Sequence, residues 1–296
     1  MKNLINKSLS QIGFRIVRKK CLEPENFMEV NLSDAHHLSY CQGNNGIVTR
    51  VSIDKGRGLP IFSFSGLSLH PFVIAARAAL TVDDDPLLTV KFVLRNYYEL
   101  VNPSCPNSIL GLKSEHSELK DLPGWAVVMP WDKENALEWK EKIISSVLSE
   151  NTRYGKRVGV EYGWAWTGPS SEIKVEIEST RLLSVLYSIQ KNGYKRNNGP
   201  DGDIVVNVLA KSADDWVWQS IAAQHRAAVM AALTYDSVPV RIMKVIRRDD
   251  VLSWPNVKRG LYSESEALKI FDDIYSANYK HVTSEWEKFV LANGLT

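Results

Sequence analysis

A histidine and an arginine stand at the point where a strand-like run passes into an alanine-rich segment. The segment reads Ile221-Ala-Ala-Gln-His-Arg-Ala-Ala-Val-Met, and its Ala and Met content predicts a helix that begins near Gln224. The first N–H groups of a helix and the positive end of its dipole attract anions. We therefore predict that Ala223 and Gln224, together with His225 and Arg226, bind phosphate groups. His225 is also a candidate acid or base.

A charged loop precedes this segment. Lys195 and Arg196 are followed by Gly199-Pro-Asp-Gly-Asp203. Phosphoryl transfer needs cations that bind phosphate and a carboxylate that holds Mg²⁺ or accepts the proton of the attacking hydroxyl. We predict that Lys195 and Arg196 bind a nucleotide. Asp201 and Asp203 are predicted to be catalytic, and Asp203 is also the predicted Mg²⁺ ligand. The alternative is a solvated loop whose charges pair with one another.

The elements that must position these residues follow from hydrophobic patterns. Two β-branched runs, Ile204–Leu209 and Trp216–Ile221, flank the polar turn Lys211–Asp215 and are typical of a hairpin. A further run, Ser237–Ile242, follows the alanine-rich helix. Before the loop we expect a helix that begins at Ser179 and ends at Gly193, a residue type favoured just beyond a helix C-terminus.

This order of elements resembles the ParB/sulfiredoxin fold over roughly Glu172–Ile246. In that family, ParB N-terminal domains, sulfiredoxins and ParB-like free serine kinases place Gly-Glu-Arg-Arg, Gly-Cys-His-Arg or Asp-Gly-His-His-Arg at a helix N-terminus that holds nucleotide phosphates. His225 and Arg226 match this motif. Ala223 stands at the position of the family's Gly and restricts the backbone more. Gln224 replaces the reactive Cys of sulfiredoxin, so the chemistry of sulfiredoxin, which needs a thiolate at this position, is excluded.

The resemblance implies a nucleotide such as ATP, bound with Mg²⁺. In the ParB-like kinases an acidic residue ahead of the preceding helix helps to activate the acceptor hydroxyl, and Glu176 or Glu178 corresponds to it here. We place Glu176 among the catalytic candidates. The expected function is an ATP-dependent phosphotransferase, a kinase for a small hydroxylated molecule or sugar. The alternative is a non-catalytic nucleotide-binding scaffold. Association with DNA is disfavoured, because the formal net charge is only +2.

The chain of 296 residues is long enough for two units, and we expect an α/β protein, α+β overall. The predicted division is a basic amphipathic helix at 1–20, an α+β unit at 21–155 and a ParB/sulfiredoxin-like unit with C-terminal helices at 156–296. The connector carries Trp164 and Trp166, which would share one face of a strand. They form either a stacking platform for a sugar or a seal between the two units.

The N-terminal segment has no acidic residue and carries Lys2, Lys7, Arg15, Arg18, Lys19 and Lys20. Its apolar residues recur at helical spacing, as they do in helices that lie on an anionic membrane surface. The alternative is a helix that packs on its own domain. This opening resembles proteins of bacterial surface-polysaccharide clusters, which implies a role in polysaccharide or lipopolysaccharide biosynthesis. The three cysteines lack Cys-x-x-Cys spacing and the chain has no 18-residue apolar run, which together predict a cytoplasmic protein. The basic N-terminal segment adds the expectation of a peripheral location at the inner membrane.

Further elements are expected along the chain. Predicted strands are Gly46–Ile53, Leu59–Phe64 and Ala126–Met129, with a turn at Gly56–Gly58 between the first two. Predicted helices are Ser68–Leu80, Leu87–Val101, Glu134–Leu148, Ser265–Ser276 and Ser284–Ala292. Ser263 and Glu266 have the spacing of a capping box at the start of a helix.

Overall fold

The computed structural model describes residues 35–41, 46–58, 61–65, 68–113, 117–196 and 202–295. It is a mixed α/β structure with an open sheet of five strands, so the predicted α+β class is confirmed. The helix predicted at residues 1–20 lies outside the described residues, and so does Asp201.

The sheet has the strand order β1-β5-β3-β4-β2. Its strands are β1 Ile47–Ser52, β2 Gly56–Arg57, β3 Ile204–Ala210, β4 Trp216–Ala222 and β5 Ser237–Arg247. The central strand β3 is parallel to β5 and antiparallel to β4, while β1 is antiparallel to β5 and β2 is parallel to β4. Nearly all of β3 is buried, which explains why all of its residues except Asn207 are apolar.

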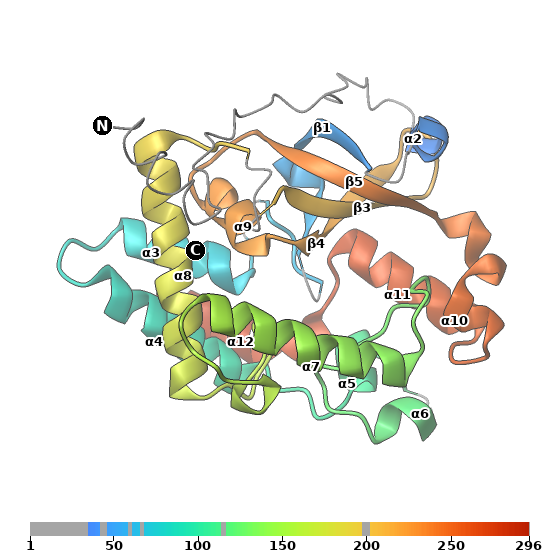
Figure 1. The fold of residues 1–296 in the computed structure, drawn as a ribbon, viewed down its shortest axis with the longest axis horizontal. Helices are drawn as coiled ribbons and strands as arrows, with labels where there is room; N and C mark the ends of the chain where they lie inside the picture. The colour runs from blue at the N-terminus through green and yellow to red at the C-terminus, as the bar shows by residue number, and fades with distance from the viewer. Residues whose placement is uncertain are drawn as a thin grey trace, which may run out of the picture.

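Helices account for most of the remaining described chain. They are α2 Ala35–Cys41, α3 Pro71–Leu80, α4 Pro86–Leu100, α5 Pro106–Leu110, α6 Ser117–Lys120, α7 Ala136–Arg153, α8 Glu172–Asn192, α9 Gln224–Ala232, α10 Pro255–Lys258, α11 Glu264–Ser276 and α12 Lys280–Ala292. The described 3₁₀-helices are η1 Ile53–Lys55, η2 Val160–Tyr162 and η3 Arg248–Ser253. Figure 1 shows the sheet in the upper part of the molecule, with α8, α9 and α3 on its left and α7 and α12 below.

The helices α3, α4, α8 and α9 pack against one another and share one hydrophobic core with the sheet. Phe72 of α3, Leu182 of α8 and Val229 of α9 are fully buried in it. Burial of apolar area on this scale is the main source of folding free energy. This packing fixes α9 next to α8, and that contact builds the site described below.

Most of the expected elements are confirmed. The hairpin is β3–β4, and the alanine-rich helix begins at Gln224, as predicted. Gly193 follows α8 with a positive φ of 66°. The capping box at Ser263 and Glu266 is formed, with both reciprocal contacts present. Within the N-terminal half, α3, α4 and α7 occupy the three predicted helical segments with shifted ends.

The predicted start of α8 was wrong. The helix begins at Glu172 and not at Ser179, because the Ser171 side chain accepts a hydrogen bond from the backbone N–H of Lys174 and caps it there. Within this added part of the helix, Glu172 forms an ion pair with Arg95 of α4, and Glu176 forms one with Lys91 of α4. The whole of α8 therefore packs as one helix.

Two predictions in the N-terminal half also need correction. Ala126–Met129 is buried but forms no strand. Side chains hold this segment instead, since Tyr262 donates to the carbonyl of Val128 at 2.6 Å and Asn256 Nδ2 to that of Met129 at 2.9 Å. The turn expected at Gly56–Gly58 contains β2, and Arg57 forms an isolated bridge with Ser63.

One sheet takes strands from both predicted units. β1 and β2 precede residue 156 in the chain, yet they pair with β5 and β4. The Trp218 indole also donates a hydrogen bond of 2.8 Å to the carbonyl of Ser52. The division into two units stays a prediction, and the described strands join these two parts of the chain in one sheet.

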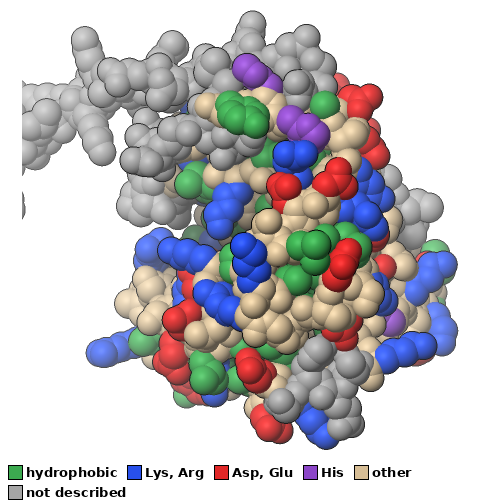
Figure 2. All heavy atoms as spheres, turned by 90° about the vertical axis from the view of Figure 1, so that its right-hand side faces the viewer, with side chains coloured by type: hydrophobic (Ala, Val, Ile, Leu, Met, Phe, Trp, Pro, Cys, Tyr) green, Lys and Arg blue, Asp and Glu red, His purple; other side chains and the backbone are tan. Residues whose placement is uncertain are grey.

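Basic and acidic side chains are intermingled on the face that holds α10 and α11 (Figure 2). Several are paired there, such as Arg248 with Asp272 at 2.8 Å. A mixed surface of this kind creates no extended field of one sign.

Candidate functional site

A pocket of about 810 Å³ lies where the sheet, the start of α9 and the inner side of α7 meet. This volume falls within the range of about 300–1,000 Å³ that is typical of small-molecule sites. Two irregular segments, 127–134 and 164–166, complete its wall and contribute Trp131, Trp164 and Trp166. Trp139 of α7 is a fourth indole in the wall. The pocket thus combines aromatic surface with a helix N-terminus.

The α9 N-terminus opens at this pocket, with Ala223, Gln224 and His225 in its wall. Ala223 is the N-cap and has left-handed backbone angles, with φ 62° and ψ 35°. Its methyl side chain cannot accept a hydrogen bond, so no side chain caps the helix. Because no side chain occupies this helix end, its free N–H groups and the helix dipole would favour an anion in the adjoining part of the pocket.

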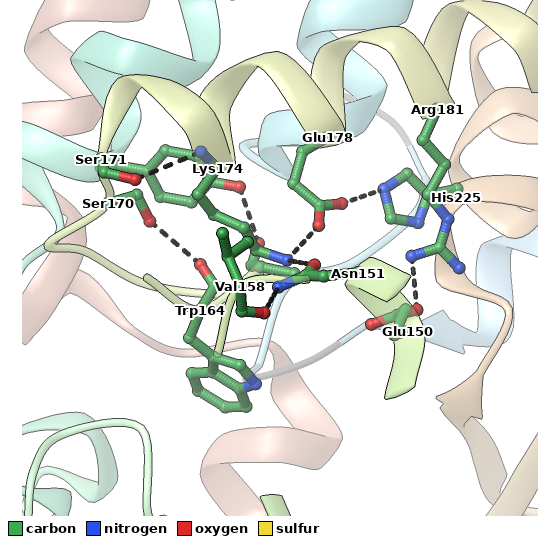
Figure 3. Close-up of polar contacts among 12 residues, drawn as sticks. Glu150, Asn151, Val158, Trp164, Ser170, Ser171, Lys174, Glu178, Arg181 and His225 are labelled. Atoms are coloured by element: carbon green, nitrogen blue, oxygen red, sulfur yellow. Dashed lines mark hydrogen bonds and ion pairs between the residues drawn. The ribbon is translucent and has the colours of Figure 1, made fainter. Parts of the chain in front are cut away.

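Behind this N-terminus lies a buried chain of polar groups, drawn in Figure 3. Oε2 of Glu178 is 2.7 Å from Nε2 of His225, and Oε1 of Glu178 accepts a hydrogen bond of 2.5 Å from the Lys174 ammonium. Lys174 also donates to Asn151 Oδ1 at 2.9 Å, and Asn151 Nδ2 donates to the carbonyl of Val158 at 2.8 Å. Lys174 and Glu178 are fully buried. The chain therefore joins α7, α8 and α9.

The environment sets the charge of each group. Burial raises the pKa of Glu178, but the Lys174 ammonium and the contact with His225 outweigh it, so the net shift is downward. Burial lowers the pKa of His225, and the nearby Arg181 lowers it further. At neutral pH, Glu178 is a carboxylate and His225 a neutral imidazole. Nε2 of His225 and Oε2 of Glu178 face each other at 2.7 Å, so this ring nitrogen is directed at the carboxylate.

Charged pairs line the α7 side of the pocket. Arg181 contacts Glu150 (Figure 3). Its guanidinium group also lies over the ring of Tyr154, 4.9 Å from the centroid. Burial lowers the pKa of Arg181, but Glu150 and Glu178 raise it by more. Lys142 donates to Glu134 at 2.9 Å. Two of the cations in this wall, Arg181 and Lys142, are thus matched by carboxylates.

Asp132 was not found by sequence reasoning, although it lies in the pocket wall. Its Oδ2 accepts a hydrogen bond of 2.9 Å from the backbone N–H of Met129. Burial raises the pKa of Asp132 to about 6, and the weaker effects of Met129 and Lys244 oppose the rise. Asn256 of α10 holds this loop by donating to three of its carbonyl groups. A carboxyl group that titrates near neutrality is suited to acid–base chemistry.

The predicted catalytic carboxylates lie elsewhere. Asp203 is held by Arg196, at 2.8 and 2.7 Å, and by Arg241, at 3.0 and 2.6 Å. Burial raises its pKa, but these two guanidinium groups outweigh burial and lower it. Glu176 forms a surface ion pair with Lys91 of α4. Among the described residues of the pocket wall, neither of these carboxylates is present.

The predicted phosphate-binding residues are divided between two environments. Gln224 is buried in the pocket wall, and its Nε2 donates to the carbonyl of Ser220 at 3.3 Å. Arg226 instead donates to the carbonyl of Gly202, away from the pocket wall. Lys195 is exposed, and Arg196 pairs with Asp203. Of the predicted set, the structure brings Ala223, Gln224 and His225 together at the pocket.

Trp164 and Trp166 lie in an irregular segment and not in a strand, so the geometric basis for a shared face was wrong. Both nevertheless line the pocket. Trp166 packs edge-on against Phe72, with ring centroids 5.4 Å apart, and lies 6.1 Å from the His225 ring. These indoles therefore contribute to the core and to the pocket wall at once.

Comparison with protein-family models, curated proteins and solved structures finds no match for this chain. The resemblance to the ParB/sulfiredoxin fold therefore stays a prediction. In the described part of the chain, no helix is long and apolar enough to cross a membrane. No group of three or more His, Cys, Asp or Glu side chains that could hold a metal ion is found among the described residues.

Proposed function

We propose that this protein binds a nucleotide in the pocket, with the phosphates at the α9 N-terminus and the base among the tryptophans. The observation that carries the proposal is the opening of α9, without a side-chain cap, beside buried His225 in a pocket of about 810 Å³. Backbone N–H groups and a helix dipole bind phosphate without a need for a particular side chain. Indole rings stack on planar heterocycles.

The cations of the wall support an anionic ligand. Arg153, at the end of α7, lines the pocket and has no ion-pair partner among the described residues. Lys244 of β5 lines it as well and is exposed. Charge-assisted hydrogen bonds to phosphate are stronger than neutral ones. These two side chains are the cations we assign to the phosphates.

A phosphotransferase reaction is the proposed use of the nucleotide. The γ-phosphoryl group passes to a hydroxyl oxygen of the acceptor: a new P–O bond forms, the bond to the leaving nucleoside diphosphate breaks, and the Asp132 carboxylate accepts the hydroxyl proton. A sugar, such as one from a bacterial surface polysaccharide, remains the proposed acceptor class. Mg²⁺ does not fit at Asp203, because both of its oxygens accept hydrogen bonds from arginines. We assign no protein ligand to the ion.

The finer fold assignment, a ParB/sulfiredoxin-like unit, is part of this proposal. The hairpin β3–β4, the helix α9 and the return of β5 parallel to β3 support it. A nucleotide-gated scaffold without turnover is the second candidate. The clamped state of Asp203 favours it, since the carboxylate expected to act in catalysis is already engaged by two arginines.

Nucleotide binding is tested by isothermal titration and by thermal unfolding with ATP, ADP and CTP, each with and without Mg²⁺. A ligand that binds only the folded state raises the unfolding midpoint. Arg153→Ala should weaken binding by about 10-fold or more, the effect of losing one charge-assisted hydrogen bond. Arg157→Ala is the matched control, because Arg157 is exposed in the same segment but outside the pocket wall. The proposal is wrong if no nucleotide binds, or if both variants bind equally.

A further inference from the structure

Two amide side chains interrupt otherwise apolar runs in the middle of the sheet. Asn207 lies in Ile-Val-Val-Asn-Val-Leu-Ala of β3, and Gln219 lies in Trp-Val-Trp-Gln-Ser-Ile-Ala of β4. They are directly paired across the antiparallel ladder, so their side chains leave the sheet on the same face. Both are buried, with 6% and 1% of their surface exposed, and both line the pocket.

One atom of each amide lacks a partner. Neither Oδ1 of Asn207 nor Nε2 of Gln219 has a hydrogen bond. A buried polar group whose hydrogen bond is not made costs free energy that a similar apolar side chain would not. Leu209, two residues further along β3 and therefore on the same face, is apolar and buried, so an apolar side chain suits this face of the strand. The fold therefore gains nothing from these two unsatisfied atoms.

Two irregularities in the sheet bring further side chains to the same place. The register of β3 shifts against β4 beyond Val205, which leaves Ile221 as an extra residue. It shifts against β5 beyond Val206, which leaves Met243 as an extra residue. Both extra residues line the pocket. Bulges re-aim side chains and are enriched beside functional sites, so this part of the sheet is shaped toward the pocket.

We propose that Asn207 and Gln219 read the hydrogen-bonding edge of the nucleobase. Oδ1 of Asn207 accepts from an N–H of the base, and Nε2 of Gln219 donates to a neighbouring ring nitrogen or carbonyl. Amide side chains are well matched to such edges, because they supply a donor and an acceptor in one plane. The inference rests on the proposed nucleotide site and assigns the base-specific part of it.

The unsatisfied amides can also be tested without a ligand, through the thermal stability of variants. Asn207→Leu and Gln219→Met replace amides by apolar groups of similar size, so both variants should unfold at the same temperature as the wild type or higher. Leu209→Asn serves as a control, since it introduces an amide at a buried, apolar β3 position on the same face and should lower the midpoint. Destabilised Asn207→Leu and Gln219→Met variants would mean that the amides support the fold, and would overturn the inference.

The binding test compares ATP, GTP, CTP and UTP with tripolyphosphate, which has no base. The wild type should bind one of the four nucleotides at least 10-fold more tightly than it binds the weakest. Asn207→Leu and Gln219→Met should each reduce this ratio of nucleotide affinities. Their affinity for tripolyphosphate should differ from that of the wild type by less than about two-fold. If tripolyphosphate binds and the four nucleotides bind equally, or if the ratio survives both substitutions, base reading is refuted and the phosphate site stands. If nothing binds, the proposed function itself fails.

Discussion

Oε2 of Glu178 and Nε2 of His225 lie 2.7 Å apart and join α8 to the first turn of α9. The carboxylate is stabilised from its other side by Lys174, and the imidazole is kept neutral by burial. A buried carboxylate with a single cation is held in place by electrostatics at a high desolvation cost. The position of His225 in the pocket therefore depends on Glu178 and Lys174.

Breaking this chain should be costly. Lys174→Met leaves the Glu178 carboxylate buried without its cation and should lower the free energy of unfolding by about 3–5 kcal/mol. The double variant Lys174→Met/Glu178→Leu should recover part of that loss, and urea denaturation measures both. Lys288→Met is the control, because its pair with Glu285 is largely exposed and should contribute less than about 1 kcal/mol. If Lys174→Met and Lys288→Met lowered the free energy of unfolding equally, Lys174 would not be the buried cation that stabilises Glu178.

Two buried histidines should make the protein less stable in mild acid. Burial lowers the pKa of His70 to about 3 and also lowers that of His225. Below pH 6.5 the unfolded chain takes up protons at these residues while the folded protein does not, so stability falls as the pH decreases from 6.5 toward the folded pKa values. Each histidine contributes at most about 1.4 kcal/mol per pH unit.

The raised pKa of Asp132 acts in the opposite direction, since its folded form binds a proton below pH 6 more readily than the unfolded form. Free energies of unfolding measured at pH 6.5 and 5.0 give the net effect of the two histidines and Asp132. His70→Asn keeps an N-cap for α3, because His70 Nδ1 accepts from the N–H of Phe72 and Asn can do the same. This variant should reduce the pH dependence. An unchanged slope would mean that His70 is not neutral in the folded state.

Ala223→Gly should stabilise the protein by up to about 1 kcal/mol. Ala223 adopts φ 62°, and a left-handed conformation costs a residue with a Cβ roughly 1–2 kcal/mol, which the greater flexibility of glycine in the unfolded chain partly offsets. Ala277→Gly is a matched control with φ 55° at the end of α11, far from α9 in the chain. Both should raise the unfolding midpoint, and only Ala223→Gly should alter nucleotide affinity. A variant that is less stable than the wild type would show that the left-handed backbone of that alanine is not strained.

Asp203→Asn separates two roles for this carboxylate. The clamp with Arg196 and Arg241 implies a loss of about 1.5–3 kcal/mol of stability, the range for hydrogen bonds to charged groups, with nucleotide affinity changed less than a few-fold. The catalytic role expected from the sequence implies instead an intact fold and a loss of turnover of about 10²-fold or more. Urea denaturation and phosphate release, measured on one preparation, decide between them.

Asp132→Asn tests the proposed base. Turnover should fall by about 10²-fold or more while nucleotide affinity stays within a few-fold, because the carboxylate acts on the acceptor hydroxyl. In the wild type, the rate should rise with pH through about 6 as Asp132 loses its proton. A pH profile without this rise, or a variant with full turnover, would remove Asp132 from the reaction. Glu134→Gln is the control, since Glu134 lies in the same wall and is paired with Lys142.

Local chemistry in the sequence determined the hairpin, the helix that begins at Gln224 and the placement of His225 in its first turn. β-Branched runs around a polar turn, alanine content and capping residues act over a few positions, so these elements follow from short stretches alone. The predicted start of α8 at Ser179 was wrong, because the Ser171 cap and packing on α4 extend the helix to Glu172. Asn207 and Gln219 stand in the sequence as polar residues within apolar runs, but the lack of a partner for one atom of each follows only from the folded sheet.

The tertiary structure decided which charges share a site. His225 and Arg226 are adjacent in sequence, but successive helix positions point in different directions, so one reaches Glu178 and the other Gly202. Lys195, Arg196, Asp203 and Glu176 have the residue types for phosphotransfer, yet they lie outside the pocket wall or pair elsewhere. Asp132 acquired its raised pKa only from burial in a loop held by Asn256 of α10. Burial and long-range pairing depend on the packed fold, and no local pattern encodes them.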